Sequence, residues 1–244
     1  MKQNLDLGQH FMIDKSVLKN IIKTASLSSQ DKVLEIGPGK GALTKLLEQT
    51  PIKKLICVEQ DSRFEVQGEK IEFIQGNILN VIDGLTFTTV VANIPYHISE
   101  PLFQAFLRKQ PKKIVVVVGI QFAKKLLEET ILGTIIRELY TVKLIQEIPR
   151  EAFDPAPRTK SALLHLESKK LSLMGELLIS FYTSSKNKVK NYLSVGTKNK
   201  YTKKEFKILL EELPQSILEK YNYELSTEEF LQLIHFLQKT FLNK

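Results

Sequence analysis

Short apolar runs of strand length alternate with helical patterns over the first two thirds of the chain, and this alternation constrains the fold most. Strand-like runs lie at 32–36, 54–59, 72–74, 88–92, 114–119, 140–148 and 162–167. Helical patterns lie between them at 18–25, 43–49, 99–107 and 122–129. Near-continuous apolar strands that alternate with helices are typical of a parallel sheet covered on both faces. No convincing helix separates the last two runs, so we expect an antiparallel hairpin at that edge of an α/β fold.

The pattern after Ser168 is helical only. Two capping boxes, which begin at Thr202 and Ser226, place a hydroxyl three residues before a glutamate and therefore mark helix starts. Apolar residues then recur on one helical face: Phe230, Ile234, Leu237 and Phe241. Such a stripe predicts packing in a core, not a ligand site. We expect a larger α/β domain at 1–168 and a small helical domain at 169–244.

The charge of the chain favours a polyanionic partner. Its 244 residues carry a formal net charge of +8, and no apolar stretch approaches the roughly 20 residues that a membrane helix needs. Nucleic acid is therefore a better candidate than a membrane. The single cysteine, Cys57, excludes an intrachain disulfide and a multi-cysteine metal site. It lies in a strand-like run, so we expect a buried thiol, no metal and a reducing, cytoplasmic compartment.

A glycine-rich turn after the first long strand predicts a cofactor site. Gly37, Gly39 and Gly41 let the backbone approach a ligand and bend into the next helix. Glu59 ends the next strand about twenty residues later, where a carboxylate can accept the hydroxyls of a ribose. The turn lacks the dinucleotide fingerprint, which favours S-adenosylmethionine over NAD. Glu35 can then approach the ammonium of the methionine part, directly or through water.

The stretch Asn93-Ile94-Pro95-Tyr96 follows the fourth strand and reaches the same edge of the sheet. The amine of a purine is a poor nucleophile, and acceptors at Asn93 and at a carbonyl near Ile94 would hold its hydrogens and expose a lone pair. Pro95 stiffens the loop and removes a donor. Tyr96 offers a flat face for a base turned out of its stack. This combination predicts transfer of a methyl group to an exocyclic amine.

Several ordered motifs then resemble one family, the ribosomal RNA adenine N6,N6-dimethyltransferases. The matching segments are 8–14 (GQHFMID), 35–41 (EIGPGKG), 93–96 (NIPY), 149–157 (PREAFDPAP) and 161–162. The first of them and Ile98-Ser99-Glu100-Pro101 are more similar to the small-subunit branch, above all its archaeal and eukaryotic members. They are less similar to the antibiotic-resistance (Erm) branch, which acts on large-subunit RNA.

The resemblance implies a class I methyltransferase fold, S-adenosylmethionine as cofactor, and roles for individual residues. It implies that Gln9, His10, Met12, Gly37, Gly39, Glu59, Asn77 and Asn93 contact the cofactor, together with Glu35. It implies that Asn93, Ile94, Pro95 and Tyr96 hold the target adenine and that Phe153 stacks on it opposite Tyr96. The implied partner is ribosomal RNA in a precursor of the small ribosomal subunit. We expect the protein to act as a monomer and not to bind a membrane.

Three positions depart from the pattern of this family. Asn77 stands where an aspartate is usual, so it accepts a hydrogen bond from the cofactor's adenine without a negative charge. His97 stands where Asn or Gln is usual, and we assign it no catalytic role. The family's loop after the fifth strand is interpreted as shortened to 128–137. These departures leave open a non-catalytic role in ribosome assembly, and also the same chemistry on large-subunit RNA.

Lysines interleaved with tyrosines between 186 and 207 predict a surface for RNA phosphates. We expect Lys186, Lys188 and Lys190 to contribute to it. A solvated helical face is the alternative interpretation of the same pattern.

Overall fold

The computed structural model describes residues 9–183, 188–197 and 202–242, and the chain divides into two compact units. The first unit comprises residues 1–127 and 140–168, and the second comprises 128–139 and 169–244. Residue 168 is the last residue of the first unit, where the sequence predicted a boundary. The segment 128–139, which we had placed in the larger domain, belongs with the helical unit instead.

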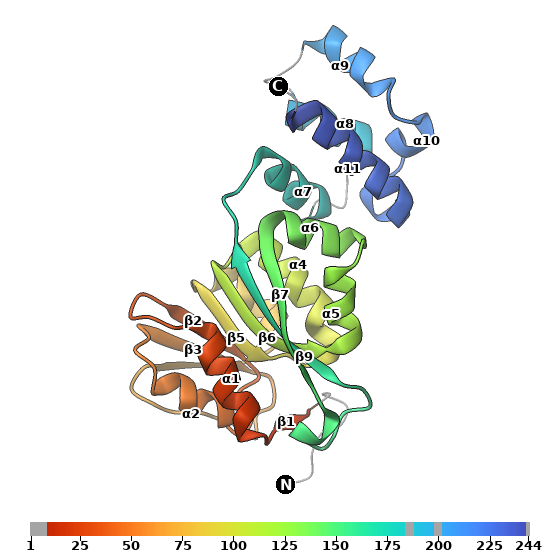
Figure 1. The fold of residues 1–244 in the computed structure, drawn as a ribbon. Coiled ribbons are helices and arrows are strands. Elements are labelled where there is room, and N and C mark those ends of the chain that lie inside the picture. Colours follow the sequence, from red (N-terminus) through yellow and green to blue (C-terminus); the bar gives the residue numbers. More distant parts are fainter. Residues whose placement is uncertain (1–8, 184–187, 198–201, 243–244) are drawn as a thin grey trace. The chain divides into compact units, whose positions relative to one another are not determined.

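A seven-stranded sheet forms the centre of the first unit, with the strand order β4-β3-β2-β5-β6-β9-β7 (Figure 1). Its parallel strands are β2 (Lys32–Ile36), β3 (Lys54–Glu59), β4 (Ile71–Gln75), β5 (Thr89–Asn93) and β6 (Lys113–Gly119). Two antiparallel strands follow, β9 (Ser161–Ser168) beside β6 and β7 (Tyr140–Ile148) at the edge. The predicted mostly parallel α/β sheet and its antiparallel closing hairpin are both confirmed.

Helices cover both faces of this sheet because the chain crosses over in opposite directions from β2. The crossover to β3 contains α2 (Ala42–Glu48), which packs against α1 (Lys15–Ala25). The crossover from β5 to β6 contains α4 (Ser99–Lys109), and α5 (Ile120–Leu127) follows β6; Figure 1 shows both away from α1. A short helix, α3 (Ile78–Val81), follows β4. Cys57 is fully buried in β3, which confirms the expected core thiol.

Two short strands that the sequence analysis missed tie the N-terminal segment to a distant part of the chain. β1 (Phe11–Met12) pairs antiparallel with β8 (Phe153–Asp154), so that Met12 faces Phe153. Both side chains are buried in one hydrophobic cluster with Ile148 and Leu163. A two-residue strand has no periodicity of its own, so only this pairing over a long sequence separation reveals it.

The described part of the second unit is built from helices joined by short loops, with one isolated β-bridge between Lys188 and Tyr221. Its helices are α6 (Ile131–Leu139), α7 (Leu173–Thr183), α8 (Val189–Thr197), α9 (Lys203–Leu210), α10 (Gln215–Leu218) and α11 (Thr227–Leu242). Short 3-10 turns occur in both units at Ile82–Gly84, Tyr96–Ile98, Arg150–Ala152 and Asn222–Glu224. Both predicted capping boxes form, with reciprocal hydrogen bonds between Thr202 and Glu205 and between Ser226 and Glu229.

The predicted stripe on α11 is confirmed at three positions, since Phe230, Ile234 and Leu237 are buried; the side chain of Phe241 lies outside the described part. The interpretation of 128–137 as a shortened loop is wrong. Most of that segment forms α6, whose Leu132, Ile135 and Ile136 are buried. In the described ranges, no helix has the length and apolarity that crossing a membrane requires.

Candidate active site

A cavity of about 280 Å³ opens at the carboxyl ends of the parallel strands. The residues that line it come from the N-terminal segment (9–13) and from the ends of β2 (35–40), β3 (58–60) and β5 (93–98), together with Leu18, Ile21, Ala42, Leu43, Gly76 and Ile78. Ligands of open α/β sheets bind at this edge, beside the point where the strand order reverses. The fold therefore brings the predicted glycine turn, both glutamates and the Asn93–Tyr96 stretch to one place.

The glycine turn after β2 requires glycine for two separate reasons. Gly37, Gly39 and Gly41 have φ values of +65°, +53° and +74°, in the region that side chains with a Cβ rarely adopt. A Cβ on Gly39 would also lie 2.7 Å from Cε1 of Phe11. The Phe11 ring therefore packs directly on the turn, and the ammonium of Lys40 lies 4.6 Å from its centroid.

Phe11 is a site residue that the sequence analysis did not single out. Its neighbours in the N-terminal motif received roles, but Phe11 holds the glycine turn and lines the cavity. The motif at 8–14 could have indicated this role, because an aromatic side chain can pack directly on a glycine that has no Cβ.

Glu59 is positioned to bind hydroxyl groups from the cavity. One carboxylate oxygen accepts a hydrogen bond from the Gly39 amide at 3.0 Å, and the other accepts one from the Asp61 amide at 2.8 Å. These bonds fix the carboxylate, and each oxygen keeps a further lone pair for a ligand. Burial raises the pKa of Glu59, and the two backbone amides oppose that shift by favouring the charged form.

Glu35 lies deeper in the cavity and is only 2% exposed. Burial raises the pKa of its carboxyl to about 7, although the hydroxyl of Thr44 and the thiol of Cys57 lower it. The Cys57 Sγ donates to Oε2 of Glu35 at 3.6 Å. A ligand ammonium near Glu35 would favour the ionised carboxylate, because an opposite charge offsets the loss of water.

The N-terminal segment closes one side of the cavity through several polar contacts. The Gln9 amide donates to Oδ2 of Asp61 at 2.6 Å, and the Arg63 guanidinium also bonds this carboxylate and lowers its pKa. Nδ1 of His10 lies 2.8 Å from the Pro155 carbonyl oxygen. The predicted cofactor residues Gln9, His10 and Met12 thus all line the cavity.

The side chain of Asn93 is held by this same segment. Its Nδ2 donates to the carbonyl oxygen of His10 at 3.0 Å, which fixes the orientation of the amide. The Ile94 amide donates to the Val117 carbonyl at 2.9 Å and anchors the stretch to β6. Among the described residues, neither Oδ1 of Asn93 nor the carbonyl oxygen of Ile94 receives a hydrogen bond. Two acceptors are therefore left at the cavity.

Tyr96 begins a 3-10 turn and is held by contacts at its edge and on one face. Its hydroxyl lies 2.5 Å from Oγ of the fully buried Ser161. Its ring lies against Gly119, where an added Cβ would be 3.4 Å from Cγ of the tyrosine. The His10 ring is 5.8 Å away and tilted by 32°. The absence of a side chain at Gly119 lets the ring lie flat on β6, as a platform for a base requires.

Two predicted site residues do not line the cavity. Phe153 is 3% exposed and packs in the core beside Met12, so it does not lie opposite Tyr96 as predicted. The β1–β8 pairing buries its ring in the hydrophobic core. Oδ1 of Asn77 accepts from the Leu79 amide at 2.9 Å and caps α3, while its neighbours Gly76 and Ile78 line the cavity.

Two of the lysines that were predicted to bind RNA phosphates form ion pairs with an acid of the second unit. Lys188 and Lys190 both contact the carboxylate of Glu219, at 2.9 Å and 2.5 Å. The two lysines lower the pKa of Glu219, with Lys190 the larger cause. Lys186 lies outside the described residues. The acid is thirty residues away in sequence, which is why the local charge pattern gave no sign of this neutralisation.

The donors and acceptors of the cavity fit S-adenosylmethionine. Glu59 suits a ribose diol, Glu35 suits an ammonium, and the tight glycine turn leaves room where a side chain would intrude. No set of three potential metal ligands occurs in the described ranges. The carboxylates of Glu35 and Glu59 suit an organic cofactor that carries hydroxyl groups and a positive charge.

Comparisons with known proteins agree with this site. A family described as ribosomal RNA adenine dimethylase matches residues 1–239. A Thermococcus gammatolerans protein named probable ribosomal RNA small subunit methyltransferase A is 30% identical over 255 residues, which cover 98% of this chain and 90% of the relative. A protein of the same name from Methanococcus maripaludis is 34% identical over 184 residues, 70% of each chain.

Two solved structures share the fold. A dimethyladenosine transferase from Plasmodium falciparum aligns with a TM-score of 0.64 and 23% identity, covering 95% of this chain and 98% of that one. The 23S rRNA methyltransferase ErmE aligns with a TM-score of 0.58 and 19% identity, covering 93% and 99%. At this identity they show the architecture alone. The match over residues 1–239 establishes that the chain belongs to the ribosomal RNA adenine dimethylase family.

Proposed function

We propose that this protein methylates N6 of adenine in small-subunit ribosomal RNA, twice at the same nitrogen, during ribosome assembly. Membership of the adenine dimethylase family, whose cofactor is S-adenosylmethionine, supports the chemistry. The names of the relatives from Thermococcus and Methanococcus support the small subunit. The observation that carries the proposal is the fixed Asn93 amide, which leaves an oxygen acceptor at the cavity.

Bound S-adenosylmethionine supplies an electrophilic methyl group on a sulfonium. The chain itself has to position an amine whose lone pair is delocalised into the purine ring. Oδ1 of Asn93 and the carbonyl oxygen of Ile94 accept the two N–H hydrogens of that amine, which draws the nitrogen toward tetrahedral geometry. Because Nδ2 of Asn93 is already bonded to His10, the oxygen is oriented before the substrate arrives.

Tyr96 supports the base rather than taking part in proton transfer. One face of its ring rests on Gly119, and burial raises the pKa of its hydroxyl, which Ser161 opposes. The phenol therefore stays neutral, and the ring stacks on an adenine that has left its helix. The amine loses a proton after methylation, so no strong general base is required at this position.

The test compares Asn93→Ala with wild type in single-turnover methyl transfer from labelled S-adenosylmethionine to small-subunit particles. The expected loss is roughly a hundredfold to a thousandfold, as for removal of one preorganised polar group. Asn80→Ala, which removes an exposed amide after the cavity-lining Ile78, is the matched control and should keep the wild-type rate. A rate for Asn93→Ala within a few-fold of wild type would contradict the proposed role.

A further inference from the structure

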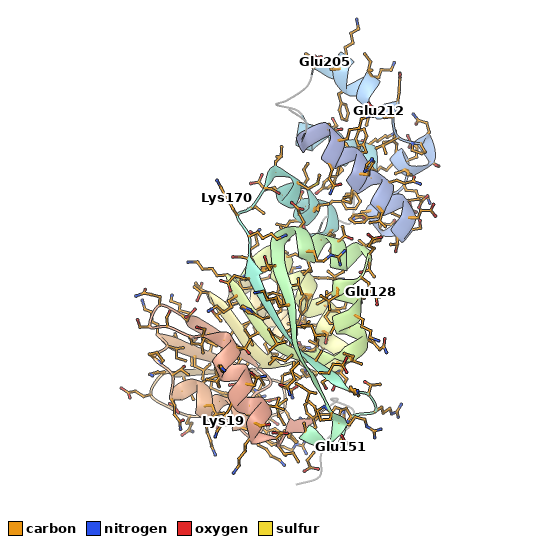
Figure 2. All side chains as sticks on the ribbon, viewed as in Figure 1. Lys19, Glu128, Glu151, Lys170, Glu205 and Glu212 are labelled. Carbon is orange, nitrogen blue, oxygen red and sulfur yellow. The ribbon has the colours of Figure 1, made fainter. Side chains whose placement is uncertain are left out.

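The outward face of α1 carries a row of three exposed lysines, Lys15, Lys19 and Lys23. Figure 2 labels Lys19 on this helix. Residues four apart lie on one face of an α-helix, with about 6 Å of rise between them, so the row extends over about 12 Å. The eleven residues of α1 contain no acid.

This row is unfavourable for the helix itself. Lysines spaced by four residues repel each other, and Lys15 in the first turn opposes the helix dipole, although Lys23 in the last turn suits it. None of the three ammonium groups forms a hydrogen bond or ion pair with a described residue. By contrast, Lys188 and Lys190 share Glu219, and Lys125 contacts Glu100. Some lysines elsewhere are thus paired with acids, whereas the three on α1 are paired with none that the structure describes.

The other face of α1 forms part of the active-site cavity. Leu18 and Ile21 line the cavity wall, and exposed Ile13 lies at the cavity just before the helix. Lys40 of the glycine turn also lines the cavity, and α2, which packs on α1, exposes Lys45. Lys40 and Lys45 therefore add positive charge to the same unit as the row on α1.

We propose that Lys15, Lys19 and Lys23 form a row that binds backbone phosphates of the RNA substrate beside the cavity. This inference rests on the proposed function, and it adds a surface that contributes to the affinity for RNA. A row of flexible ammonium groups contacts phosphates and does not read bases. It holds the RNA while the Asn93–Tyr96 stretch selects the adenine.

The experiment measures binding of a small-subunit ribosomal RNA transcript at several salt concentrations. Wild type is compared with the triple variant Lys15→Gln, Lys19→Gln, Lys23→Gln and with the double variant Lys188→Gln, Lys190→Gln. Each lost phosphate contact flattens the slope of log affinity against log salt by roughly 0.7–0.9. The triple variant should therefore lose roughly two units of slope. Two lost phosphate contacts would flatten the slope by roughly 1.4–1.8, and the double variant should lose less than this, because both of its ammonium groups bind Glu219.

Two further measurements separate loss of charge from loss of structure. A triple Lys→Arg variant keeps the charges and should keep the wild-type slope. Calorimetric affinity for S-adenosylmethionine should stay within twofold of wild type in all variants, since these side chains point away from the cavity-lining face.

Each remaining outcome overturns a specific statement. A wild-type slope for the triple Gln variant, with normal RNA binding by wild type, overturns the phosphate row and leaves the proposed function standing. Failure of wild type to bind the transcript overturns the phosphate row, whereas absence of methyl transfer to small-subunit particles overturns the proposed function. A triple variant that keeps its RNA slope but loses binding to vesicles of phosphatidylglycerol and phosphatidylcholine overturns the RNA assignment in favour of an anionic membrane surface.

Discussion

Tyr96 makes two contacts with different roles in the cavity. Its hydroxyl bonds Ser161 and contributes to stability, whereas its ring lies on Gly119 and serves as the platform for a base. Tyr96→Phe removes the hydrogen bond to Ser161 but keeps the ring on Gly119. We expect Tyr96→Phe to keep turnover within a few-fold of wild type while losing about 1–2 kcal/mol of unfolding free energy, because the Ser161 hydroxyl is left buried without its partner.

Tyr96→Ala removes the stacking platform itself. A stacked base contributes about 1–3 kcal/mol. We therefore expect a roughly tenfold to hundredfold lower single-turnover rate with little change in affinity for the transcript, because most affinity comes from phosphate contacts. Equal rates for Tyr96→Ala and Tyr96→Phe would exclude stacking on this ring.

The protonation of Glu35 links stability to pH. The folded-state pKa is raised to about 7 from 4.5, so the native state holds a proton that the unfolded chain releases between these values. This contribution to stability is complete below about pH 4.5 and is lost as pH rises to about 7. Its full size is on the order of 3 kcal/mol.

Glu35→Gln removes this titration. Relative to wild type, the variant should be more stable against urea at pH 8, with the difference shrinking toward pH 5, and it should bind S-adenosylmethionine more weakly. A stability difference that is equal at both pH values would show that Glu35 does not titrate in this range. Unaltered cofactor affinity would remove its assigned contact with the ammonium.

The largest differences between the sequence-based predictions and the structure occur in short helices and strands. Asn77 was interpreted through its place in a motif, but its side chain caps α3 through the Leu79 amide. We expect Asn77→Ala to lower the free energy of unfolding by about 1 kcal/mol, whereas Asn77→Asp, an equally good cap, should change it little. Urea unfolding of both variants measures this. Equal destabilisation by both would show that the cap is not what matters.

The main strands and the glycine turn could be predicted because their signals are local: apolar runs of strand length, and glycines before a helix. The β1–β8 pair and the burial of Phe153 could not, since they depend on contacts between residues about 140 positions apart. The helix α6 was missed because the resemblance to the family placed a shortened loop at 128–137. The stability of this helix comes from burial of Leu132, Ile135 and Ile136.

For the whole molecule, net charge predicted the class of partner but not the surface that meets it. The excess of 35 basic over 27 acidic side chains says nothing about which lysines are neutralised in the fold. Glu219 binds two lysines that the local pattern favoured, whereas three lysines on α1 that the sequence analysis did not name have no acid partner among the described residues. Only the folded arrangement separates these two groups.

The most direct measurement is to incubate the protein with labelled S-adenosylmethionine and separated, unmodified small and large ribosomal subunits, and then to map the labelled nucleosides. N6,N6-dimethyladenosine should form in small-subunit RNA, at discrete adenines, and depend on Asn93. Label confined to large-subunit RNA, or to an atom other than N6, would contradict the account; so would the absence of transfer by a protein that binds both cofactor and RNA.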